Sequence, residues 1–161
     1  MHWVKRHLAA LLLVLPLLVA CTEPQYPRDT EGTLLRATDG ELVVGASAHR
    51  PHIDVSDGGE VSGPEAEIVM SFAESIGAEI QWVQGSESEL MEQLKIGELD
   101  VVAGGLTSDS PWSTHAALTR PYGAAVGPDG KERKLVLATR LGENALLSAL
   151  ERHLIDEGLQ P

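Results

Sequence analysis

Apolar residues follow two different spacings along residues 42–105, one typical of strands and one typical of helices. Residues 42–47, 78–83 and 100–105 are short apolar or alternating runs, which predict three strands. Residues 64–77 and 86–97 carry apolar side chains at helical spacing, which predicts two amphipathic helices. The order strand, helix, strand, helix, strand predicts right-handed crossovers and a parallel sheet that is covered on both faces.

The ends of both predicted helices carry local signals. Pro64 lies just inside the start of the first helix, and Gly77 lies just past its end. The second helix follows Ser86, and Glu89 stands three residues later, which is the pattern of a capping box. Gly97 follows the last apolar position and ends this helix.

The remaining segments predict a loop, a hairpin and a last helix. Residues 49–62 are rich in Pro, Asp and Gly, which predicts a loop. Residues 122–126 and 134–139 flank the turn sequence GPDG at 127–130, so we expect an antiparallel hairpin near the C-terminus. Residues 143–155 predict the last helix. Its inward positions are Leu146, Leu147, Leu150 and Leu154.

The first residues of the chain resemble the signal of a bacterial lipoprotein. Lys5 and Arg6 precede an apolar run over 8–18, and small residues precede Cys21. This pattern resembles a lipobox, in which Cys21 is acylated and becomes the first residue of the mature protein. A single transmembrane anchor is the alternative, but the run is interrupted by Pro16 and is shorter than the roughly 20 residues that a bilayer requires.

Processing before Cys21 would leave 141 of the 161 residues, enough for one domain with its own core. The removed segment holds two basic and no acidic residues, so the formal charge would change from −12 to −14. This acidity disfavours nucleic acid and anionic lipid headgroups as partners. Cys21 is the only cysteine, so its lipidation excludes disulfides, thiolate catalysis and cysteine metal sites. We expect a signal over 1–20, a lipidated cysteine with a flexible tether over 21–32, and a domain over 33–161.

Four segments together resemble the bacterial extracellular solute-binding proteins of family 3. They are GELVVGAS from residue 40, SGPEAEIVMSFAESIGAEIQWV from residue 62, SELMEQLKIGELDVVAGGLTSDSPW from residue 88, and LTRPYG from residue 118. GELDVVAGGLT and TRPY are the most specific parts. The resemblance implies a ligand receptor of an ABC-type uptake system. Such receptors have the type II periplasmic-binding-protein fold, with two lobes around a ligand cleft.

The second lobe has no counterpart in this chain. Residues 134–154 resemble the strand and helix with which the family's chain returns to its first lobe, but only residues 127–133 precede them. We therefore expect one α/β lobe of three layers (αβα), built from 33–126 and 131–157 and joined by the turn at 127–130. Its sheet is expected to be mostly parallel, with the antiparallel hairpin near the C-terminus. Loss of the second lobe would remove half of the usual ligand contacts and the hinge closure.

Candidate ligand-binding residues follow the predicted strands, because open α/β sheets bind ligands beyond the carboxyl ends of their strands. The resemblance implies that Thr107 holds a ligand carboxylate. The family's arginine is replaced by Pro111 and Trp112, so Arg50 or Arg120 would have to substitute for it. Trp112 is either a stacking platform or a packing residue, and Tyr122 is expected to pack at the hinge position. The full set of candidates is His49, Arg50, Thr107, Asp109, Trp112, Arg120 and Tyr122.

Other kinds of site find less support. His49, His52, Asp54 and Asp57 contain zinc-ligating groups, but their loop has no fixed spacing, and we expect no metal and no cofactor. No serine lies in a Gly-x-Ser-x-Gly motif, and no GxGxxG or P-loop sequence occurs, so we do not expect an enzyme.

The sequence therefore favours a lipid-anchored, solute-binding-like protein on the periplasmic side of the cell envelope. It would recognise a small polar solute such as an amino acid, as the substrate-binding component of an ABC-type transporter. A permease or a second copy of the chain would close its open face. In a Gram-negative host, Thr22 after the lipidated cysteine predicts sorting to the outer membrane. The alternative is a regulatory or protein-interaction lipoprotein that has lost solute binding.

Overall fold

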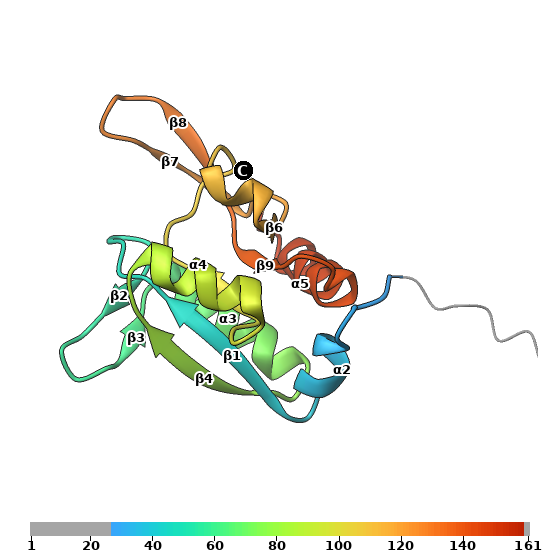
Figure 1. Ribbon diagram of the computed structural model, residues 1–161. Coiled ribbons are helices and arrows are strands. Elements are labelled where there is room, and N and C mark those ends of the chain that lie inside the picture. The colour runs from blue at the N-terminus through green and yellow to red at the C-terminus, as the bar shows by residue number, and fades with distance from the viewer. Residues whose placement is uncertain (1–26, 160–161) are drawn as a thin grey trace, which may run out of the picture.

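A five-stranded mixed sheet lies at the centre of the computed structural model, which describes residues 27–159 (Figure 1). The predicted signal, Cys21 and most of the predicted tether lie outside these residues. The strand order is β4-β1-β5-β9-β6. Strands β1 (Glu41–Ala46), β4 (Glu79–Gln84) and β5 (Val101–Ala103) are parallel, as the sequence predicts. Two further strands, β9 (Ala138–Arg140) and β6 (Ala116–Leu118), extend the sheet on the β5 side.

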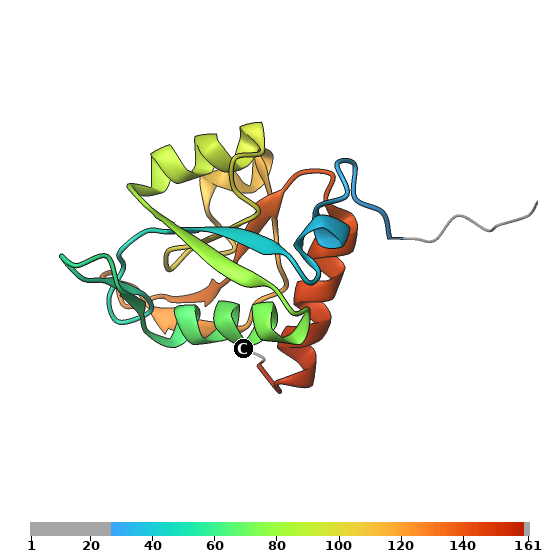
Figure 2. The same cartoon turned by 90° about the horizontal axis from the view of Figure 1, so that it is seen from below.

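Three helices cover the two faces of this sheet (Figure 2). Helices α3 (Pro64–Ser75) and α5 (Asn144–Asp156) pack on one face, and α4 (Glu87–Ile96) packs on the other. The predicted three-layer α/β fold is therefore confirmed. The predicted capping box of α4 is present, because Ser86 and Glu89 exchange hydrogen bonds between side chain and backbone.

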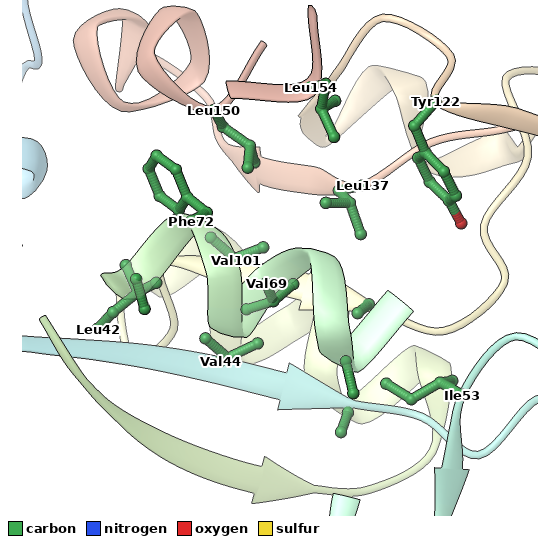
Figure 3. Packing of buried hydrophobic residues seen from close by; sticks show 14 of the residues in the cluster. Leu42, Val44, Ile53, Val69, Phe72, Val101, Tyr122, Leu137, Leu150 and Leu154 are labelled. Atoms are coloured by element: carbon green, nitrogen blue, oxygen red, sulfur yellow. The ribbon is translucent and has the colours of Figure 1, made fainter. Parts of the chain in front are cut away.

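The larger hydrophobic core lies between the sheet and helices α3 and α5 (Figure 3). Val69 and Phe72 of α3 and Leu150 of α5 are at most 1% exposed and pack against strand residues such as Val44 and Val101. A smaller core lies under α4, where Leu90, Met91 and Leu94 pack against the other face of the sheet. The apolar spacing of each helix thus matches the face that it buries.

The predicted hairpin is present as β7 (Gly123–Val126) and β8 (Glu132–Leu135), which project from the edge of the sheet (Figure 1). The run 134–139 was expected to form one strand, but it divides between β8 and β9. Between them, the N–H of Val136 donates to Leu106 and that of Leu137 donates to Thr119, so the chain changes partners at this point. The expected loop at 49–62 contains a short ladder of β2 (Asp54–Val55) and β3 (Val61–Ser62).

The N-terminal segment is joined to α5 by reciprocal helix caps. Asp29 accepts hydrogen bonds from the first N–H groups of α5 and from Leu34 of α2 (Thr33–Ala37), at 2.7–2.9 Å. In return, Glu143 accepts from the N–H groups of Glu31 and Thr33. Burial raises the pKa of Glu143, but hydrogen bonding to the side chain of Thr33 and to these N–H groups, with the charge of Arg140, outweighs it and leaves the pKa below its usual value. Residues 29–32, which the sequence places in the tether, are thus attached to the domain, and the short helix α2 follows them.

Candidate functional site

A cavity of about 710 Å³ opens beside the carboxyl ends of β1 and β5. Three segments enclose it: the loop after β1, the loop after β5, and the β7–β8 hairpin. Glu87, the first residue of α4, also lines it. This is the edge at which open α/β sheets bind ligands, and α4 begins beside it. The described chain therefore surrounds the cavity from two sides within one lobe.

The first wall is the loop at residues 49–52, which follows β1. The N–H of His49 donates to Ile53, and the rings of His49 and His52 stack with their centroids 5.9 Å apart. The Arg50 guanidinium lies 2.8 Å from the Asp54 carboxylate, and its hydrogen bond holds the pKa of Asp54 below the usual value. Arg50 is largely exposed, so the wall presents a solvated ion pair at its rim and two imidazoles.

The floor of the cavity is the loop after β5. Gly105 has a positive φ of 66°, and a Cβ there would lie 2.7 Å from the His49 ring, so only glycine fits. Thr107 and Asp109 follow on the same loop. The Thr107 hydroxyl hydrogen-bonds to the Asp109 carboxylate, and this holds the pKa of Asp109 below its usual value. The floor therefore offers a hydroxyl and a carboxylate that already contact each other.

The second wall is the hairpin, which contributes Val126, Gly127, Pro128 and Arg133 among its lining residues. Arg133 binds Asp129 through two parallel hydrogen bonds of 2.8 and 3.0 Å, and these lower the pKa of Asp129. Its Nε atom also lies 3.7 Å from Asp109 on the floor. The hairpin therefore places a guanidinium group in the cavity, between two carboxylates.

A buried carboxylate supports the site from below. Glu65, in the first turn of α3, accepts hydrogen bonds from the N–H of Gly105 at 2.9 and 3.1 Å and from the Tyr122 hydroxyl. Its own N–H donates to His52. Burial raises the pKa of Glu65, and the hydrogen bonds of Tyr122 and Gly105 offset only part of this rise. Burial, together with the charge of Glu65, also raises the pKa of Tyr122. One side chain thus joins the loops after β1 and β5 to the start of the hairpin.

The structure brings together some of the residues that the sequence selects. His49, Arg50, Thr107 and Asp109 line the cavity. Trp112 lies next to it in the short helix η2 (Pro111–Thr114), and its indole N–H donates to the cavity-lining Glu87.

Arg120 and Tyr122 do not line the cavity. The backbone N–H of Arg120 donates to Glu151 on α5, and its Nε is buried without a hydrogen-bond partner among residues 27–159. Tyr122 is buried and contacts the site through its hydroxyl, which donates to Glu65, and through its backbone N–H, which donates to Leu135.

The sequence analysis missed Glu65 and Arg133. An acidic residue in the first turn of a helix is common, because it interacts favourably with the helix dipole, so Glu65 carries no distinguishing signal. Arg133 enters the cavity only because the hairpin lies against the floor. In the part of the chain that the structure describes, no three His, Cys, Asp or Glu side chains are grouped so as to hold a metal ion. Within the same residues, no helix combines the length and apolarity needed to cross a membrane.

Comparison with known proteins identifies the family of the chain. Residues 42–154 match the family model for the bacterial extracellular solute-binding proteins, family 3. The chain is also 34% identical over 122 residues to the membrane-bound lytic murein transglycosylase F of Maricaulis maris (strain MCS10). This match covers 74% of the chain but 27% of the relative, so the chain spans about a quarter of the transglycosylase's length.

Several solved structures share the fold. A point mutant of the arginine-bound form of domain 1 from TmArgBP of T. maritima is 25% identical, with a TM-score of 0.67 over 77% of this chain and 96% of that domain. The arginine-specific periplasmic binding protein STM4351 of Salmonella typhimurium is 13% identical, with a TM-score of 0.64 over 75% of this chain and 94% of that one. The second likeness concerns the fold alone.

Proposed function

Because the chain belongs to the bacterial extracellular solute-binding proteins, family 3, we propose that it binds a small polar solute, such as an amino acid, in the cavity beside β1 and β5. The observation that carries this proposal is the cavity itself, which one lobe encloses between the loop after β1 and the hairpin. The arginine-bound domain 1 of TmArgBP supports it, because that structure is a single domain with a bound amino acid.

The lining suits a solute with charged groups. It contains two guanidinium groups, two carboxylates, two hydroxyls and two imidazoles, besides apolar side chains such as Leu106 and Val126. A few polar groups set among apolar ones are typical of small-molecule sites. An amino acid carries both an ammonium and a carboxylate group, so it can pair with groups of either sign.

The location of the protein completes this proposal. The lipobox-like sequence before Cys21 supports attachment to the membrane by lipid, with the domain on the periplasmic side of the envelope. There the protein would serve as the substrate-binding component of an ABC-type transporter. Metabolic labelling with a palmitate analogue tests the anchor: label is expected on the native chain and not on Cys21→Ser.

Calorimetric titration tests solute binding directly. The full-length chain in detergent is titrated with L-arginine, L-glutamine and L-glutamate, and heat that saturates at one solute per chain is expected for at least one of them. The variant Thr107→Val serves as the comparison, because it removes a hydroxyl from the floor and keeps the side-chain shape. Absence of saturable heat with all three solutes counts against the proposal.

The transglycosylase relative favours a second candidate function. Since a segment of that membrane-bound enzyme is 34% identical to this chain, the domain would act as a regulatory or interaction module for another envelope protein. Pull-down from crosslinked membranes would then recover one specific protein, while the amino-acid titrations stay blank. Saturable solute binding with no recovered partner would contradict this second candidate.

A further inference from the structure

The cavity contains two guanidinium groups, and they lie in different surroundings. The Arg50 side chain is 77% exposed and pairs with Asp54 at the rim. The Arg133 side chain is 32% exposed and lies between Asp129 and Asp109. Building on the proposed function, we infer that Arg133 is the residue that binds a carboxylate group of the solute, and that it selects carboxylate-bearing solutes.

Backbone hydrogen bonds fix the hairpin next to Arg133 relative to the floor. The N–H of Ser108 donates to Lys134, and the N–H of Val136 donates to Leu106, each at 2.9 Å. Between these two hydrogen bonds, Thr107 and Leu135 form an antiparallel bridge. Residues 106–108 and 134–136 therefore form one short ladder, and Arg133 immediately precedes it in the sequence. A preorganised cation loses little freedom when it binds an anion.

The guanidinium group is presented in the geometry that recognises carboxylates. Its Nη1 and Nη2 atoms bind the two oxygens of Asp129 in parallel, which is the arrangement a solute carboxylate would adopt. The Asp129 side chain is 41% exposed. Exposed ion pairs contribute little to stability, so a solute carboxylate can take the place of Asp129 at small cost. Asp129 thus occupies the binding position until the solute arrives.

Gly127 makes this arrangement possible. A Cβ at residue 127 would lie 1.9 Å from Nη1 of Arg133, so the guanidinium group lies directly against this glycine. The Gly127 backbone does not have a positive φ, so alanine is tolerated there and the flexible arginine has to move. Gly127→Ala therefore displaces the guanidinium group and leaves the charges of the cavity unchanged. The variant Gly127→Ala therefore tests the effect of the position of Arg133 separately from the effect of its charge.

Isothermal titration of the full-length chain tests the inference, with L-arginine, L-glutamine and L-glutamate and with their α-carboxamides as probes. The best-bound amino acid is expected to lose at least about tenfold in affinity when its α-carboxylate is replaced by the amide. Arg133→Gln is expected to weaken the amino acid by a similar factor and to leave the amide unchanged. Gly127→Ala is expected to act in the same direction. Asp129→Asn removes the internal competitor, so it should tighten the amino acid.

Two controls keep the outcome clear. Arg152→Gln, an exposed position on α5, makes the same charge change away from the cavity and should leave affinity unaltered. Thermal unfolding of each variant shows whether it is folded. The inference is wrong if Arg133→Gln binds the amino acid like the native chain, or if Arg50→Gln alone removes the preference for the acid over the amide. If none of the amino acids binds to the native chain, the proposed function fails together with the inference.

Discussion

Replacing Glu65 should reveal how much of the fold and of the cavity depends on one buried carboxylate. Glu65 is fully buried, and it accepts hydrogen bonds from Gly105 and from Tyr122. Glu65→Ala removes the acceptor of the buried Tyr122 hydroxyl and of the partly buried Gly105 N–H. Each unsatisfied group costs about 1–3 kcal/mol, so we expect a loss of about 2–6 kcal/mol in the free energy of unfolding for the two groups. Glu67→Gln, an exposed position on the same helix, is the control and should cost less than about 0.5 kcal/mol.

Glu65→Gln should change how stability depends on pH. Because the pKa of Glu65 is raised in the folded chain, the folded state binds this proton more tightly than the unfolded state does. Its contribution to stability is therefore complete below the unfolded pKa of about 4.3 and is lost as the pH rises through the folded pKa. The slope reaches at most about 1.4 kcal/mol per pH unit between these two values. Glutamine does not titrate, so this loss is absent in the variant.

Urea unfolding followed by circular dichroism at several pH values between 4 and 8 measures both effects. The native chain should lose stability relative to Glu65→Gln as the pH rises. Tyr122→Phe should extend this loss to higher pH, because the Tyr122 hydrogen bond lowers the pKa of Glu65. A difference between the native chain and Glu65→Gln that is constant with pH, or that grows in favour of the native chain as the pH rises, would refute the reasoning.

Three further substitutions test the way in which the elements are held together. Asp29→Ala removes the acceptor for three N–H groups of α2 and α5, so it should lower the free energy of unfolding in urea by about 1–2 kcal/mol. It should also make residues 27–33 sensitive to limited proteolysis, and an unchanged cleavage pattern would contradict the reciprocal caps. Phe72→Ala empties a core position that is 1% exposed and should cost about 3–5 kcal/mol, against less than about 1 kcal/mol for the half-exposed Met70→Ala. Ser86→Ala removes the capping box of α4 and should cost about 1 kcal/mol, whereas the exposed Ser88→Ala should leave the midpoint of unfolding within error.

The elements that could be predicted from the sequence are those with local signals at their ends. Pro64, the capping box at Ser86 and the GPDG turn act within a few residues, so α3 and α4 begin and end close to the expected positions and the hairpin turns where expected. Strand β6 has no such signal. Its three residues, Ala116–Leu118, become a strand only because β9 lies beside them, and that pairing joins residues 20 to 24 positions apart. Non-local pairing of this kind cannot be inferred from a short apolar run.

The same distinction applies to the cavity. Thr107 and Asp109 could be selected because they follow a predicted strand, and their place in the sheet fixes them at its carboxyl edge. Arg120 also follows a strand, but the added strand β9 separates β6 from β5, and Arg120 does not line the cavity. Arg133 follows the GPDG turn, between this turn and the predicted strand at 134–139, where a charged residue is ordinarily solvated. Only the ladder between residues 106–108 and 134–136 brings it to the cavity.

The ladder between residues 106–108 and 134–136 also affects the binding free energy that a site within one lobe can reach. In a receptor that closes around its solute, part of the binding free energy is used to populate the closed state. Here the second wall is already hydrogen-bonded to the floor, so the free energy needed to close the site is small. The same wall leaves Asp129 and Arg133 in contact with water, which weakens each ion pair in the cavity. Under the proposed function, such a site would have weaker electrostatics than a closed cleft and would need no hinge, and the inference makes the position of Arg133 the main determinant of which solutes bind.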